Sequence, residues 1–95
     1  MKIAKEFILR DIAGECVLVP TGATVQEYNG LIMLSDVARF IWENLEQVND
    51  FNELVEAILE EYDIDKDTAE KDTAEFLDLL GEKGLLEYTK EDKSW

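Results

Sequence analysis

The sequence predicts an α+β domain in which an N-terminal three-stranded antiparallel sheet is followed by three helices (β-β-β-α-α-α). Three observations support this prediction. Two β-prone segments flank the dipeptide Ala13-Gly14, a short apolar segment follows near residue 31, and apolar side chains then recur mostly at helical spacing. Because 95 residues can bury one modest core but not two, we expect one domain over residues 1–88 and a polar, frayed tail over residues 89–95.

The first two strands are predicted at residues 7–12 and 15–20. Ala13-Gly14 between them is typical of a two-residue hairpin turn. In that register Leu9 lies opposite Leu18 and Ile8 lies opposite Val19. Both faces of the hairpin then carry apolar groups, so alternation alone leaves open which face is buried.

The third strand is predicted at residues 31–34, after the pair Asn29-Gly30. It is short, and we expect it to lie at the edge of the sheet. Its far edge would then offer unpaired backbone N–H and C=O groups to another extended chain. The alternative is an ordinary edge strand that is protected by the C-terminal tail or by a second copy of the chain. This segment predicts a docking surface, not an active site.

Three helices are predicted next. Ser35 and Asp50 are suitable N-cap residues for the first two, and the third is expected from about Lys66 to Lys83, with Gly84 at its C′ position. Residues 85–88 suit a brief further strand. Each helix has an apolar stripe at i, i+3, i+4 spacing. The stripes are Val37, Ala38, Ile41, Trp42 and Leu45 in the first helix, Phe51, Leu54, Val55, Ile58, Leu59 and Tyr62 in the second, and Ala69, Thr73, Phe76, Leu77 and Leu80 in the third.

Charge excludes several kinds of partner. The chain has nine basic and 23 acidic residues and a net charge of −14, and nearly all of the excess lies after residue 34. Nucleic acid and anionic membrane surfaces are unsuitable partners, because binding to them needs Lys and Arg to neutralise phosphates. No apolar run approaches the roughly 20 residues of a membrane span, and residues 1–6 lack the apolar stretch of a signal peptide. With a single cysteine, Cys16, no internal disulfide can form, and we expect a cytoplasmic protein.

No catalytic residue, metal site or cofactor is predicted. The chain has no histidine, so it can form neither a Cys-His pair nor a histidine metal site. Alternating aspartates at residues 63–67 resemble the start of a calcium loop. However, Thr68 occupies the position that needs glycine and Ala74 the position that needs a bidentate glutamate. These aspartates are better explained as the acidic start of a helix, and we expect a protein that is not an enzyme.

Five segments, in this order, resemble the PqqD family. They are residues 7–15 (FILRDIAGE), 29–32 (NGLI), 38–43 (ARFIWE), 59–64 (LEEYDI) and 76–80 (FLDLL), the last followed by KGLL at 83–86. The resemblance spans residues 3–88 and implies a winged-helix-like domain, also called the precursor-peptide recognition element. Members of this family bind the leader of a ribosomally made precursor peptide and present its core to a modifying enzyme, often a radical S-adenosylmethionine (SAM) enzyme.

The resemblance further implies that the leader adds as a β-strand beside the third strand, in a groove lined by the third helix. Helix geometry of 100° per residue places a second set of residues on one flank of that helix, beside the core stripe. They are Thr68, Asp72, Glu75, Leu79 and Lys83. Leu79 lies on this flank, where it could contact a peptide or simply widen the core face. The candidate peptide-binding residues are Gly30, Leu31, Ile32, Met33, Leu34, Thr68, Asp72, Glu75, Phe76, Leu79 and Lys83.

Two classes of function fit these observations. The first is a stand-alone adaptor for natural-product biosynthesis, which captures a leader peptide and delivers it to a modifying enzyme, expected to be a radical SAM enzyme. The second is an acidic, non-catalytic interaction or regulatory domain of winged-helix shape that does not bind DNA. A homodimer is compatible with both, because an exposed strand can pair with a second copy of itself.

Overall fold

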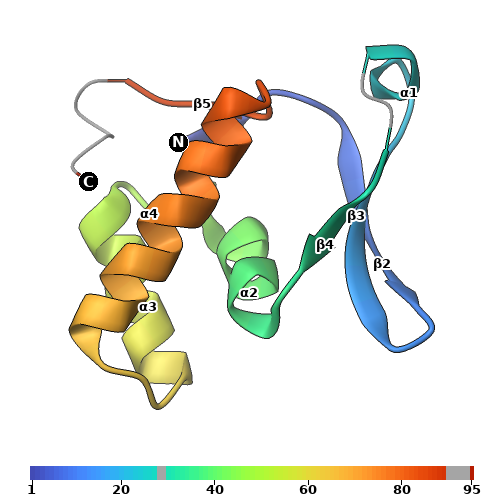
Figure 1. Cartoon of the computed structure of the whole chain (residues 1–95). Coiled ribbons are helices and arrows are strands. Elements are labelled where there is room, and N and C mark those ends of the chain that lie inside the picture. The colour runs from blue at the N-terminus through green and yellow to red at the C-terminus, as the bar shows by residue number, and fades with distance from the viewer. Residues whose placement is uncertain (28–29, 90–94) are drawn as a thin grey trace.

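The chain folds into a three-stranded sheet beside a layer of three helices (Figure 1). The computed structural model describes residues 1–27, 30–89 and 95. The predicted α+β class is confirmed. The elements in chain order are β1 (Lys2–Ile3), β2 (Phe7–Ile12), β3 (Glu15–Pro20), α1 (Thr24–Glu27), β4 (Ile32–Leu34), α2 (Asp36–Asn44), α3 (Phe51–Glu61), α4 (Lys66–Glu82) and β5 (Leu86–Glu87).

The main sheet has the order β2-β3-β4 and is antiparallel. Ala13 and Gly14 have φ of 53° and 83°, which are the positive angles that a type I′ hairpin turn needs at both central residues. This turn sets the register, and both predicted pairs, Leu9 with Leu18 and Ile8 with Val19, are confirmed. The third strand begins one residue later than predicted, at Ile32.

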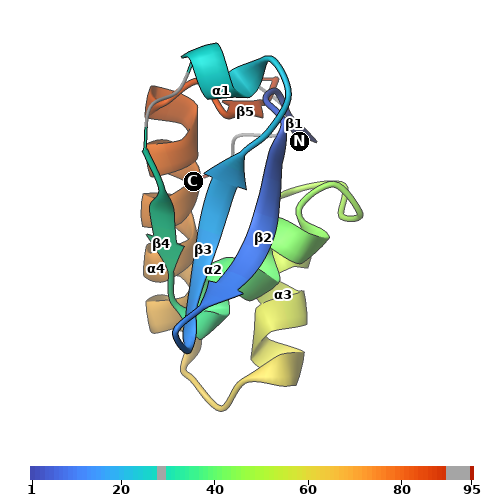
Figure 2. The ribbon, with the colours of Figure 1, turned by 90° about the vertical axis from the view of Figure 1, so that its right-hand side faces the viewer.

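The sheet packs one face into the core, which settles the question that the sequence left open; Val17 on the opposite face is also buried but does not belong to the core cluster. Leu18, Ile32 and Leu34 lie on the face that packs into the core against the helices. Figure 2 shows the helices behind the sheet on that side only. The opposite face carries the exposed side chains of Ile12 and Met33, which are 50% and 63% accessible.

All three predicted long helices are present, each with a side-chain N-cap. The Ser35 hydroxyl accepts a hydrogen bond from Ala38 N–H, and the Asp50 carboxylate accepts one from Glu53 N–H. The C-terminus of α4 closes at Gly84, where φ is 74°. Leu85 N–H donates to the carbonyl of Leu80 at 2.9 Å, which is the hydrogen bond of a Schellman motif. At the start of α4 the Asp65 carboxylate accepts a hydrogen bond from Thr68 N–H, so caps fix both ends of this helix and hence the position of its side chains.

Two short elements were not predicted. The brief strand expected at 85–88 is present as β5, and it pairs with β1. At two residues β1 is too short to show a sequence pattern, and its pairing spans almost the whole chain. The four-residue helix α1 lies in the loop before β4. Within the described residues, no helix has the length and apolar character needed to cross a membrane.

Part of the predicted tail cannot be compared with the structure. Residues 90–94 lie outside the described residues, so the frayed tail and the domain boundary at residue 88 stay predictions. Asn29 of the Asn29-Gly30 pair also lies outside the described residues. Trp95 departs from the expectation of a frayed end. Its ring stacks on Phe51 with centroids 5.3 Å apart, and its indole N–H donates to the Asp78 carboxylate at 2.8 Å.

The N-cap of α4 predicts a pH dependence of stability. Hydrogen bonds from the Thr68 backbone N–H and then the Thr68 hydroxyl hold the pKa of the Asp65 carboxyl below its usual 3.8. A lowered folded-state pKa stabilises the fold above the unfolded pKa, and this stabilisation is lost as pH falls through the folded value. Asp65→Asn keeps the shape of the cap and removes its charge. We expect a lower Tm than wild type at pH 7 and a gap that closes as pH falls below 3.8.

Thermal denaturation monitored by circular dichroism measures this gap at each pH. Glu56→Gln, on the exposed surface of α3, removes one charge away from any helix end and is the matched control. If the Tm difference between wild type and Asp65→Asn has the same size at acidic and at neutral pH, the charge at the cap is not its cause.

Candidate functional site

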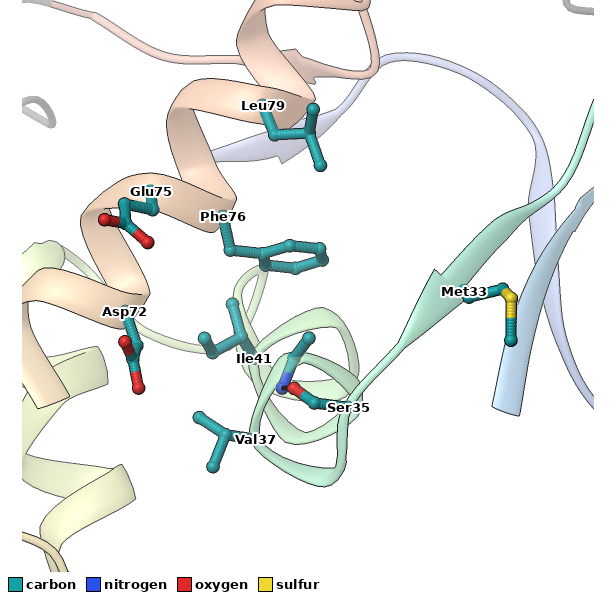
Figure 3. Close-up of a pocket in the computed structure, with 9 residues that line it drawn as sticks. Met33, Ser35, Val37, Ile41, Asp72, Glu75, Phe76 and Leu79 are labelled. Atoms are coloured by element: carbon teal, nitrogen blue, oxygen red, sulfur yellow. Dashed lines mark hydrogen bonds between the residues drawn. The ribbon is translucent and has the colours of Figure 1, made fainter. Parts of the chain in front are cut away.

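A groove of about 470 Å³ separates β4 from α4, and we call it the β4–α4 groove. The chain reverses direction through α2 directly after β4, so the first turns of α2 form its base (Figure 3). Three elements therefore contribute to one surface. The lining residues are Met33, Ser35, Val37, Ala38, Ile41, Asp72, Glu75, Phe76 and Leu79.

The floor of the groove is apolar, and most of it belongs to the core. Ile41 and Phe76 belong to the buried core, and Phe76 is only 9% accessible. Leu79 lies one turn further along α4 and remains 38% accessible. Figure 3 shows Phe76 and Leu79 both directed into the groove. The floor thus continues the protein core, which means that a docked apolar side chain would meet preformed packing.

The α4 wall of the groove is acidic. Asp72 and Glu75 lie on α4 at the edge of the floor, and both are exposed. Among the described residues, neither carboxylate forms an ion pair or hydrogen bond, and no Lys or Arg lines the groove. The site therefore presents uncompensated negative charge next to apolar surface, which favours a ligand that is both cationic and apolar.

The β4 wall offers backbone hydrogen-bonding groups. Residues opposite each other in an antiparallel pair alternate between exchanging two hydrogen bonds and exchanging none. The two-residue turn makes Ile12 and Glu15 a bonded pair. By alternation along β3, Cys16 and Leu18 then direct their backbone groups toward β4.

The partners of Cys16 and Leu18 in β4 are Leu34 and Ile32, so these two residues use their backbone groups to hold β4 in the sheet. Met33 lies between them, opposite Val17, and its N–H and C=O must point the other way. Figure 3 shows the Met33 side chain directed away from α4. Met33 therefore contributes its backbone, not its side chain, to the groove edge.

The predicted site residues divide into three groups. Met33, Asp72, Glu75, Phe76 and Leu79 line the groove. Ile32 and Leu34 form β4 with buried side chains, and Gly30 and Leu31 precede that strand. Thr68 and Lys83 lie near the two ends of the 17-residue helix α4, outside the groove lining, which takes only residues between 72 and 79 from this helix. The contact of each residue with a peptide stays a prediction.

Sequence reasoning missed the contribution of α2. The sequence predicts a cap at Ser35 and a core stripe through Val37, Ala38 and Ile41, yet all four residues also line the groove. Their position directly after the predicted edge strand was an available signal. A helix that starts at the end of an edge strand must place its first turn beside that edge.

Comparison with known proteins agrees with this geometry. The sequence profile of a family described as Coenzyme PQQ synthesis protein D (PqqD) matches residues 15–86, which include β4, α2 and α4. The solved structure described as "TbiB1 in Complex with the TbiA(beta) Leader Peptide" matches with a TM-score of 0.70 and 35% sequence identity. The match covers 95% of this chain and 100% of that chain. A search of curated proteins found no match.

The different burial of Phe76 and Leu79 predicts different effects on stability. Phe76→Ala empties part of the core, and we expect it to lower the free energy of unfolding by about 3 kcal/mol. Leu79→Ala removes a side chain that is already partly in water, so we expect a loss of about 1 kcal/mol or less. Urea denaturation of both variants checks this. Equal losses would show that Leu79 is a core residue and not an accessible part of the groove.

Proposed function

The chain belongs to the PqqD family, and on that premise we propose that it is a stand-alone adaptor that binds the leader of a ribosomal precursor peptide. The leader adds as a strand beside β4 and lies in the β4–α4 groove. The adaptor then delivers the precursor to a modifying enzyme, for which we propose the radical SAM class. The observation that carries this proposal is the backbone edge of Met33, which pairs with no further strand within the described residues and borders the β4–α4 groove.

Each part of the groove has a separate role in this proposal. Backbone pairing with Met33 supplies affinity that does not depend on the leader sequence. The apolar floor at Ile41, Phe76 and Leu79 accepts one or two leader side chains and supplies selectivity. The structure described for TbiB1 holds a leader peptide, and its similarity to this chain supports peptide binding here.

We propose that the protein does no chemistry itself. The chain has no histidine, and the groove lining offers two carboxylates and one serine hydroxyl without a basic partner for proton transfer. A shallow groove open to water is also suited to holding an extended chain, not to excluding solvent from a reaction. The modification would therefore take place in the partner enzyme.

A homodimer would use the same edge. If the β4 edges of two copies paired, Met33 of each copy would be occupied and the leader would have to compete for it. The net charge of −14 opposes such self-association. We therefore propose a monomer in the absence of peptide, which sedimentation velocity can measure.

Binding of the leader encoded beside this gene should depend on Leu79. Leu79→Glu keeps helix propensity and places a charge in the apolar part of the groove, and we expect weaker binding by about 1–3 kcal/mol. Isothermal titration calorimetry with a synthetic leader measures the change. Ile12→Glu makes a comparable substitution on the exposed outer face of the sheet and should leave the affinity unchanged.

An NMR titration with the same synthetic leader locates the bound peptide through amide chemical shifts. We expect perturbations at residues 30–38 together with residues 72–79. Normal affinity of Leu79→Glu, with shifts confined to α3 and the β2-β3 turn, would contradict strand addition at β4.

A further inference from the structure

Charge and apolar surface are arranged in a fixed order along the groove. Asp72, Phe76 and Leu79 follow one another along the groove face of α4, and Glu75 lies beside Phe76 (Figure 3). The N-terminal end of this face is thus acidic and its C-terminal end is apolar. A peptide strand that fits the groove must match this order.

The direction of β4 sets the direction of a peptide strand that pairs with it. β4 and α4 run in opposite directions, since β4 descends toward α2 while α4 rises beside it (Figures 1 and 2). Every strand pair in the main sheet is antiparallel. A strand added antiparallel to β4 therefore runs in the same direction as α4. Its N-terminal part meets Asp72, and its C-terminal part meets Phe76 and Leu79.

The register of β4 gives the spacing. Leu34 and Ile32 direct their side chains into the core, and residues paired across strands place their side chains on the same face of a sheet. The peptide residues opposite Leu34 and Ile32 therefore point into the groove. They are two positions apart, or about 6.8 Å in an antiparallel strand. Asp72 and Phe76 are four helical positions apart, or about 6 Å, so the two spacings match.

We infer that the groove selects leaders with a basic residue two positions before an apolar anchor, written [Lys/Arg]-x-Φ. This inference rests on the proposed function and adds the side-chain pattern of the ligand. The basic residue lies opposite Leu34, with its charged end near the carboxylates of Asp72 and Glu75. Its aliphatic stem lies on the first turns of α2, which form the base of the groove. Such contact suits the amphipathic side chains of Lys and Arg. The apolar anchor lies opposite Ile32 and packs on Phe76.

Overall negative charge gives a different expectation. A net charge of −14 attracts basic peptides wherever their Lys or Arg residues lie. Local selection by Asp72 and Glu75 requires the basic residue at one position relative to the anchor. The position of the basic residue therefore separates the two explanations.

A displayed library of random twelve-residue peptides tests the pattern without knowledge of the natural leader. We expect selection on the wild-type protein to enrich Lys or Arg two positions before a bulky apolar residue. Selection on Asp72→Lys/Glu75→Lys should keep the apolar anchor and enrich Asp or Glu at the earlier position. The matched control is Glu56→Lys/Glu60→Lys, which changes the net charge equally on the exposed face of α3 and should select the wild-type pattern.

Synthetic versions of one selected peptide give the magnitude. Replacing its basic residue by Glu should weaken binding to the wild-type protein about tenfold at low salt, and the difference should shrink as salt screens these exposed charges. The same replacement should strengthen binding to Asp72→Lys/Glu75→Lys.

Each contrary result has a distinct meaning. Apolar anchors selected without any charge preference would overturn this inference and leave the proposed function intact. The reversed pattern, Φ-x-[Lys/Arg], or basic residues enriched equally at every position, would also overturn it. Failure to select any peptide that perturbs the amide shifts of β4 and α4 would contradict the proposed function, and the inference with it.

Discussion

The alternation of backbone hydrogen bonds in β4 is the constraint on which the rest of this account depends. A strand in a sheet directs half of its N–H and C=O groups to each side. The register with β3 uses the groups of Ile32 and Leu34 and leaves those of Met33 on the open edge. Natural proteins protect such edges because they invite pairing with other chains. Here the open edge lies beside the β4–α4 groove, and we propose that it pairs with a leader peptide.

The helices α2 and α4 add side chains to the groove beside this open edge. Ile41 and Phe76 belong both to the core and to the groove floor, so the packing of the core also sets the shape of the groove. Asp72 and Glu75 occupy the exposed wall, where a charge carries little desolvation cost. In the proposed complex, backbone pairing at Met33 supplies affinity, and the apolar floor together with the acidic α4 wall supplies selectivity.

The sequence was sufficient for the local structure but not for the whole groove. The positive φ values at Ala13-Gly14 set the hairpin register, and side-chain caps set the helix starts, because both depend on neighbouring residues only. The angular position of Leu79 on α4 likewise followed from helix geometry. The buried face of the hairpin, the β1–β5 pair and the contribution of Val37 to the groove depend on how distant elements pack. Apart from the position of α2 directly after the edge strand, no local pattern in the sequence indicates that packing.

Hydrogen exchange at the Met33 amide tests the open edge most directly. NMR measures the exchange rate of this single N–H in the free protein and in the complex with the leader. The account predicts fast exchange in the free protein, where Ile32 and Leu34 are already protected, and a marked slowing at Met33 when the leader binds. A Met33 amide that is protected before the leader is added, or that exchanges equally fast afterwards, would contradict docking at the β4 edge.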